Sequence, residues 1–137
     1  MCEELDKIYK RRWKDEVLPP VLLGATLEFD GNVWDGLSVR VHIPDCPHAI
    51  AGWNINRMPA LVVVYNAYVA YQYQGKGIGK FLSLFRVASF HEMKAGDCDK
   101  IEQICHVAPS NELQQHILRG VGWEQLSATI WRVKGYS

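Results

Sequence analysis

The sequence has no excess of either charge, no long hydrophobic run and no N-terminal stretch that looks like a signal peptide. Lys and Arg together number 15, as do Asp and Glu, so the formal net charge is +0. Such a chain is not expected to bind nucleic acid or an anionic membrane through bulk electrostatics. Its longest apolar run, residues 60–64, is too short to cross a bilayer, and its acidic N-terminus does not look like a signal peptide. We therefore expect a cytoplasmic protein without a membrane partner.

Paired cysteine motifs are absent as well. The four cysteines are Cys2, Cys46, Cys98 and Cys105; no two form a C-x-x-C pair, and no His lies at zinc-finger spacing from two of them. The sequence thus predicts no metal site. Free thiols in a reducing cytosol are the simplest interpretation.

What the chain does have is the composition of an ordinary globular protein. Its 137 residues are 48% hydrophobic and 22% charged, which suits one domain spanning residues 1–137. Hydrophobic periodicity and the placement of Gly and Pro predict its elements. They are a helix at 3–17, strands at 21–29 and 37–43, a long loop at 44–59 holding a short strand at 49–53, a strand at 60–69, a helix at 77–94, a strand at 101–107, a helix at 111–119 and a last strand region up to 134.

The strand at 60–69 carries the clearest pattern. It is almost continuously apolar, which predicts burial on both of its faces. A right-handed crossover through the next helix would place it parallel to, and close beside, the strand at 101–107. The order of elements indicates an α/β or α+β domain. The packed side of the connecting helix is expected to consist of Phe81, Leu84, Phe85, Ala88 and Met93.

A glycine-rich loop joins this strand to that helix. Gly75, Gly77 and Gly79 lack Cβ atoms, so a ligand can approach the backbone closely. N–H groups at a helix start favour a diphosphate, and Lys76 and Lys80 add positive charge. A Walker loop is excluded because no G-K-[ST] stands at the required spacing, and a dinucleotide fingerprint is excluded because position 82 is Leu.

Two segments resemble the GNAT superfamily of N-acetyltransferases. Residues 69–82 resemble its motif A, whose signature [QR]-x-x-G-x-[GA] is met by Gln74, Gly77 and Gly79. Residues 105–111 are similar to the family's L-E-V-R-x-S-N segment, and Asn111 stands at the N-x(10)-G-F spacing from Gly122-Trp123. The resemblance covers roughly residues 60–126.

This resemblance implies a central mixed, mostly antiparallel sheet with a splayed parallel strand pair, flanked by helices. It also implies that acetyl-CoA lies as co-substrate in the wedge between the two parallel strands. The backbone of Ala67, Tyr68 and Val69 would then bind the pantetheine arm, and Asn111 would touch it from the second strand's end. The pyrophosphate would be held by the backbone N–H groups of Gln74, Gly75, Lys76, Gly77, Ile78, Gly79 and Lys80.

The positions where the family carries its proton-transfer residues differ here. Leu118 stands where many members have a Tyr acid, Val63 where some have a Glu base, and His106 replaces the Glu of L-E-V-R-x-S-N. His106 is a candidate base, since an imidazole titrates near neutral pH; a structural histidine on a sheet face is the alternative. Tyr65, which shares a face with Ala67 and Val69 in a regular strand, could line the acceptor groove, protonate the leaving thiolate, or simply pack. A backbone N–H near Val69 is the candidate oxyanion donor.

The resemblance implies an acetyl-CoA-dependent N-acetyltransferase that joins both substrates in a ternary complex. The acceptor would be a primary amine, with a protein or peptide slightly favoured over a small molecule. The alternative is a catalytically impaired CoA-binding or protein-interaction module, favoured by Leu118, by Val63 and by the short stretch after Trp123, which leaves little room for two terminal strands. No nucleic acid is expected as a partner, and a homodimer is left open.

Overall fold

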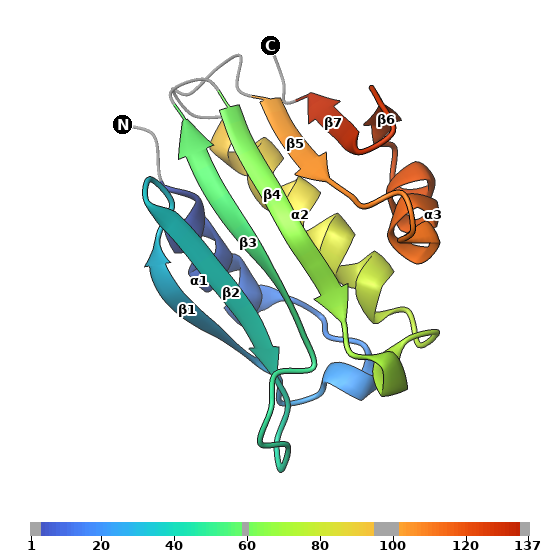
Figure 1. Cartoon of the computed structure of the whole chain (residues 1–137). Helices are drawn as coiled ribbons and strands as arrows, with labels where there is room; N and C mark the ends of the chain where they lie inside the picture. The colour runs from blue at the N-terminus through green and yellow to red at the C-terminus, as the bar shows by residue number, and fades with distance from the viewer. Residues whose placement is uncertain (1–3, 59–60, 95–101, 135–137) are drawn as a thin grey trace.

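The computed structural model describes residues 4–58, 61–94 and 102–134 of the chain. Within them, seven strands form one sheet in the order β1-β2-β3-β4-β5-β7-β6, with helices packed against it (Figure 1). The elements are α1 (Leu5–Asp15), η1 (Pro20–Leu22), β1 (Thr26–Asn32), β2 (Gly36–His42), β3 (Ala51–Met58), β4 (Leu61–Val69), η2 (Tyr71–Tyr73), α2 (Ile78–Lys94), β5 (Glu102–His106), α3 (Glu112–Gly120), β6 (Glu124–Gln125) and β7 (Ile130–Lys134).

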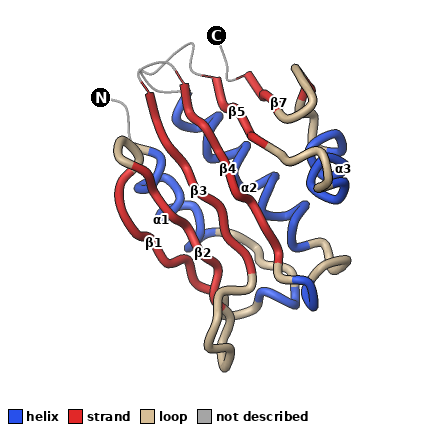
Figure 2. The backbone as a smooth tube through the Cα atoms, viewed as in Figure 1, coloured by secondary structure: helices blue, strands red, loops and turns tan. Residues whose placement is uncertain are grey.

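The sheet is mixed and mostly antiparallel. β4 and β5 form its parallel pair, and the other neighbouring strands run antiparallel. Figure 2 shows the strands side by side with α2 crossing behind β4 and β5. The predicted fold class and the predicted parallel neighbours are therefore confirmed.

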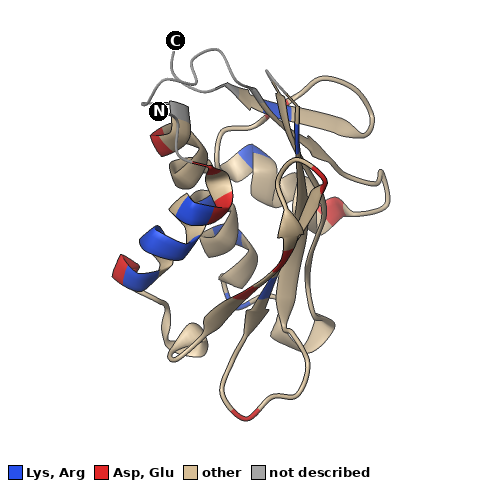
Figure 3. Cartoon of the chain, turned by 90° about the vertical axis from the view of Figure 1, so that its left-hand side faces the viewer, with Lys and Arg blue, Asp and Glu red and all other residues tan. Residues whose placement is uncertain are grey.

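Helices α1 and α2 lie on the same side of the sheet, as the edge-on view shows (Figure 3). Aromatic rings fill the space between these two helices and the sheet. The Tyr9 ring centroid lies 5.7 Å from that of Trp53 on β3 and 5.5 Å from that of Phe85 on α2. Along β2, buried residues such as Val39 alternate with more exposed ones such as Arg40. The more exposed residues lie on the side of the sheet turned away from α1 and α2.

The predicted loop at 44–59 is wrong in its second half. Residues 51–58 form β3, a central strand paired on both sides. The strand pattern of β3 is hard to recognise in the sequence. Asn54 and Asn56 are poor strand formers, and Arg57 is a charged residue that faces inward. Arg57 is only 7% exposed, and it is stabilised there by Glu4, whose Oε2 lies 3.1 Å from its Nη1, and by the Trp34 ring.

Three other predictions are corrected. The strand expected at 21–29 begins only at Thr26, because a 3-10 turn starting at Pro20 precedes it. The strand at 60–69 is not buried on both faces: Val62 and Val64 are fully buried, whereas Val63 is only partly buried, because helices cover one side of the sheet. On α2, Leu84 is 47% exposed and does not belong to the packed side.

The C-terminal stretch does form two strands. β7 pairs antiparallel with β5, and the two-residue β6 pairs with β7. The short stretch after Trp123 accommodates two strands because β6 has only two residues. None of the described helices is both long enough and apolar enough to cross a membrane.

Candidate functional site

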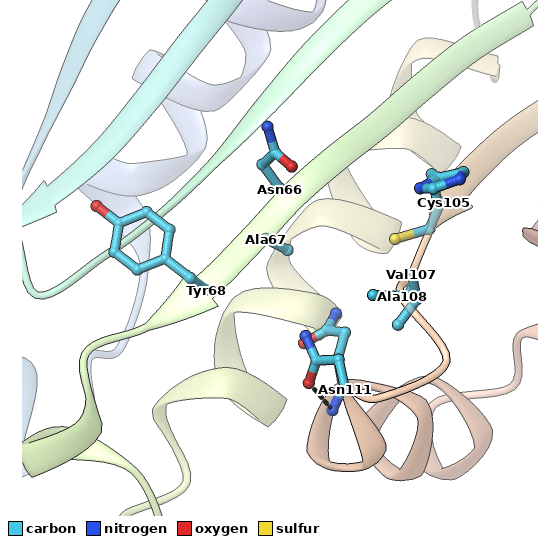
Figure 4. A pocket seen from close by; sticks show the side chains of 9 residues that line it. Asn66, Ala67, Tyr68, Cys105, Val107, Ala108 and Asn111 are labelled. Atoms are coloured by element: carbon cyan, nitrogen blue, oxygen red, sulfur yellow. Dashed lines mark hydrogen bonds between the residues drawn. The ribbon is translucent and has the colours of Figure 1, made fainter. Parts of the chain in front are cut away.

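The parallel strands separate where β5 ends. Their pairing runs from Leu61 opposite Glu102 to Tyr65 opposite His106. β4 then continues to Val69, which pairs with Ala51 of β3, whereas the chain after β5 turns toward α3. A cavity of about 470 Å³ opens between them, lined by residues 66–68, residues 105–108, Asn111 and Gln114 (Figure 4). We call it the wedge cavity.

A β-bulge in β4 borders the wedge cavity. On β3, Asn54 faces Tyr65 and Gly52 faces Tyr68, so β4 holds one extra residue in this interval. Asn66 adopts φ 54° there, a left-handed value that is uncommon outside glycine. Beyond Tyr65, β5 no longer pairs with β4, so β4 turns backbone groups toward the cavity.

The bulge also changes which side chains share a face. Ala67 and Val69 pack against the hydrophobic core. Tyr68 instead lies over Gly52, where an added Cβ would come within 2.9 Å of its ring, and Figure 4 shows it directed away from Asn111. The prediction that Tyr65 shares a face with Ala67 and Val69 assumed a regular strand and is wrong, because the extra residue shifts the alternation.

The glycine loop starts α2 beside the wedge cavity. Gly75 and Gly77 have φ values of 76° and 81°, a region that glycine enters without steric cost. The N–H of Phe81 bonds the carbonyl of Gly77 at 3.0 Å. The N–H groups of the residues just before Phe81 therefore have no partner within the helix.

A smaller cavity of about 120 Å³ lies between this loop and α3; its lining includes Val69, Gln74, Gly77, Gly79, Lys80 and Ile117. We call it the loop cavity. A Cβ on Gly79 would lie 2.8 Å from Cδ1 of Ile117, so a side chain there would crowd it. Ile78 points its own side chain into the core and is 1% exposed, which leaves only its backbone for a ligand.

Gln74 has an internal role in shaping the loop. Its Nε2 donates a hydrogen bond to the carbonyl oxygen of Val69 at 2.9 Å. This bond ties the start of the glycine loop to the last residue of β4. The sequence pattern placed Gln74 among the ligand-binding residues without indicating this contact.

Three carboxamides gather at the start of α3. The Oδ1 of Asn111 accepts the backbone N–H of Gln114 at 3.1 Å and so caps the helix. Nε2 of Gln115 donates to the carbonyls of Ala108 and Pro109, at 3.3 and 2.9 Å. Gln114 lines the wedge cavity and is buried; no sequence motif indicates it, because its position three residues after Asn111 belongs to none.

The two candidate catalytic residues stand opposite each other in the β4–β5 pairing, but their side chains line different cavities. Tyr65 and His106 are register partners. His106 is exposed and lines the wedge cavity. Tyr65 lines a hollow of about 340 Å³ near the β1–β2 hairpin, together with Asp30, Asp35 and neighbouring residues. We call it the hairpin hollow; an added Cβ on Gly36 would be 4.0 Å from the Tyr65 hydroxyl.

Other positions around the wedge offer little proton-transfer chemistry. Leu118 is fully buried in the core, and Val63 is apolar. Cys105 lines the wedge cavity and is 1% exposed. Burial raises the pKa of its thiol to about 11, although the nearby Arg86 guanidinium acts in the opposite direction. At neutral pH this thiol therefore stays protonated.

Solved structures similar to this chain are acyltransferases. IAA acetyltransferase from Bacillus cereus ATCC 14579 gives a TM-score of 0.53 at 22% identity, over 67% of this chain and 57% of its own. PaiA N-acetyltransferase from Thermoplasma acidophilum, solved in complex with coenzyme A, gives 0.55 at 17% identity, over 74% and 61%. A Klebsiella pneumoniae protein described as an acyl-CoA N-acyltransferase gives 0.55 at 12% identity, over 94% and 87%.

These likenesses concern the fold. No protein-family model matches the sequence, and no curated protein matches it either. The chain spans only 57% and 61% of the length of the first two structures. With the parallel strand pair, the wedge and the glycine loop in place, the chain has the fold of the GNAT N-acetyltransferases.

Proposed function

We propose that this chain is an acyltransferase that moves an acetyl group from acetyl-CoA to a primary amine. The observation that carries the proposal is that two cavities lie along the same strand, β4, with the glycine loop at one of them. The loop cavity includes Gly77, Gly79 and Val69 of β4 in its lining, and the wedge cavity between β4 and β5 includes Ala67, two residues earlier on the same strand. A phosphate-binding loop at the end of β4 and a cavity between β4 and β5 suit the elongated shape of an acyl-CoA.

The phosphate end is supported by the first turn of α2. Its N–H groups lack helical partners, and the helix dipole favours an anion at this end. Both Gly75 and Gly77 have open space where a Cβ would stand. Lys80 lines the loop cavity and brings a positive charge to it.

The acyl end would lie near the row of Tyr65 and His106. The amine nitrogen attacks the thioester carbonyl, the C–N bond forms, and the C–S bond then breaks. His106, which lines the wedge cavity, takes the proton that the amine loses. The N–H groups of β4 beyond Tyr65, which β5 no longer pairs, would donate to the oxyanion. The departing thiolate takes a proton from solvent.

The acceptor would enter over the hairpin hollow. Asp30 and Asp35 line it, and their carboxylates attract a protonated amine in solution. Tyr65 fits this acceptor side better than the thiolate side, because it lines that hollow. A protein or peptide amine is slightly favoured by the resemblance of residues 105–111 to the family segment.

A CoA-binding module without catalysis is the second candidate. Leu118 favours it, because this side chain is fully buried and leaves no acid at the position where many family members carry one. The two candidates agree on CoA binding and differ only in turnover.

The test measures free-thiol release from acetyl-CoA with a lysine-containing peptide, a polyamine and an aromatic amine as acceptors. Thiol release with an acetylated amine in the mass spectrum is expected for at least one of them. Gly79→Val should raise the Kd for CoA at least about tenfold, since a branched side chain would crowd Ile117. Gly120→Ala, where an added Cβ meets only open space, is the matched control.

Two results would count against the proposal. Binding of CoA with no turnover of any amine would favour the second candidate. Unchanged CoA affinity in Gly79→Val would remove the glycine loop from the site.

A further inference from the structure

The wall of the wedge cavity contains a buried polar group that has no hydrogen-bond partner among the described residues. Gln114 lies in the first turn of α3, is 8% exposed and lines the cavity. Its Nε2 is buried, and within the described part of the chain it has no hydrogen-bond partner. A buried amide in this state destabilises the protein unless something else accepts its N–H, so an unpaired one in a cavity wall indicates a ligand.

The neighbouring carboxamides are already engaged by the backbone. Asn111 uses its Oδ1 to cap α3 through the N–H of Gln114, and Gln115 holds the carbonyls of Ala108 and Pro109. These bonds fix the turn from which the Gln114 side chain projects. Resemblance assigned the ligand contact to Asn111, whereas the geometry leaves Gln114 as the buried side chain of this turn with hydrogen-bonding capacity to spare.

The chemistry of the cavity wall indicates what Gln114 binds. The residues that line the wedge cavity include no carboxylate, lysine or arginine. A carboxamide is neutral and offers both donors and acceptors, as the amides of a ligand do. The pantetheine arm of CoA contains such amides, and its charged pyrophosphate has the glycine loop instead.

We infer that Gln114 binds the pantetheine arm, with its Nε2 donating to an amide carbonyl of that arm. This inference rests on the proposed use of acyl-CoA. The bond would hold the arm against β4 and β5 and so set how far the thioester reaches toward His106. Gln114 is then a ligand-binding residue that the motifs do not include.

The experiment compares two ligands on matched variants of the full chain. Coenzyme A carries the arm, and adenosine 3′,5′-bisphosphate has the nucleotide without it. Gln114→Met keeps the length of the side chain and removes its amide, with Gln114→Leu as a second replacement should the first not fold. His116→Met on the same helix is the control, because His116 is exposed and lies outside the cavity lining.

Calorimetric titration should show the Kd for coenzyme A rising about five- to tenfold in Gln114→Met, the usual effect of losing one hydrogen bond. The Kd for the bisphosphate should not change, and His116→Met should match the wild type with both ligands. The thermal midpoint of unliganded Gln114→Met should equal or exceed that of the wild type, because the variant removes an unpaired buried amide.

Failure of the inference and failure of the proposed function give different results. If the wild type binds coenzyme A and Gln114→Met binds it equally well, the inference is overturned and the proposed function stands. A matched loss for coenzyme A and the bisphosphate would show that Gln114 only supports the fold, which also overturns the inference. A wild-type protein that binds neither ligand would overturn both.

Discussion

His106 stands at the last row of the β4–β5 pairing, exposed and in the wall of the wedge cavity. Because it would remove the amine proton in the proposed reaction, His106→Ala should lower kcat at neutral pH by about 10²-fold or more. The KM for acetyl-CoA should change little, since the residues proposed to hold the cofactor, in the glycine loop and at Gln114, do not include His106. Steady-state kinetics across pH would measure both quantities.

The control for this prediction is His116→Ala. His116 is also exposed, but it lies on α3 and does not line the wedge cavity. Its replacement should leave kcat and its pH dependence as in the wild type. Equal effects of the two replacements would remove His106 from the mechanism and leave it as a histidine on the surface of the sheet.

At the scale of single residues, the motifs predict the course of the backbone better than the environment of individual side chains. The spacing of Gly77 and Gly79 is enough to predict where α2 starts. The bulge at Asn66 was not predictable, because its left-handed conformation has no glycine to signal it. Gln114 was missed for a related reason: the burial that leaves its amide unpaired arises only when α3 packs beside the wedge.

At the scale of elements, α1 and α2 are linked by ion pairs between two arginines of α1 and one glutamate of α2. Arg11 and Arg12 both contact the Glu92 carboxylate; the Arg12 Nη1–Glu92 Oε2 distance is 2.8 Å, and Glu92 is 33% exposed. Burial raises the pKa of Glu92, but its hydrogen bonds and charge interactions with Arg12 and Arg11 outweigh this and lower it overall. Glu92→Gln should therefore destabilise the fold at neutral pH by about 0.5–1 kcal/mol, the range for partly exposed pairs.

The pH dependence of this effect has a definite sign. Since the folded pKa of Glu92 lies below its ordinary value of 4.5, the stabilisation is present above that value and is lost as pH falls through the lowered pKa. Urea unfolding should separate wild type from Glu92→Gln at pH 7 and bring them together in acid, as the pH falls through the lowered pKa of Glu92. Glu124→Gln, which removes a more exposed contact with Arg132, should have a smaller effect. A difference that stays constant as the pH is lowered into acid would contradict the assignment to charge.

Elements with regular apolar periodicity were predicted well, and those with polar inner positions were not. α2 and β5 were placed within one residue of their described bounds. The sequence pattern of β3 predicts mostly loop because Arg57 occupies an inner position, where it depends on Glu4 and Trp34, residues far away in sequence. Local patterns cannot reveal such a strand, because its stability comes from tertiary contacts.

For the whole molecule, the order of elements and two motifs were enough to predict the fold, since β4, α2, β5 and α3 follow one another along the chain. The assignment of residues 1–137 to one domain, the homodimer and the cytoplasmic location remain predictions. The same is true of the acceptor, because the proposed acceptor side involves the β1–β2 hairpin, where the resemblance to the family is thin.

The proposed acyl-CoA site draws on the centre of the sheet, so its ligand should stabilise the whole chain. The wedge and loop cavities are lined by β4, the start of α2, the end of β5 and α3. A ligand that binds only the folded state adds about 2.7 kcal/mol when present at 100 times its Kd. For a chain of this size, that corresponds to an upward shift of the melting temperature on the order of 10 °C.

Differential scanning calorimetry with and without coenzyme A would measure this shift. We expect one transition that moves as a unit, because β4 connects the β1–β3 half of the sheet to the half that contains β5–β7. Gly79→Val at the same coenzyme A concentration should shift much less, since its loop cavity is crowded. Two transitions of which only one responds to coenzyme A would show that the halves of the sheet unfold separately, and would contradict a site that couples them.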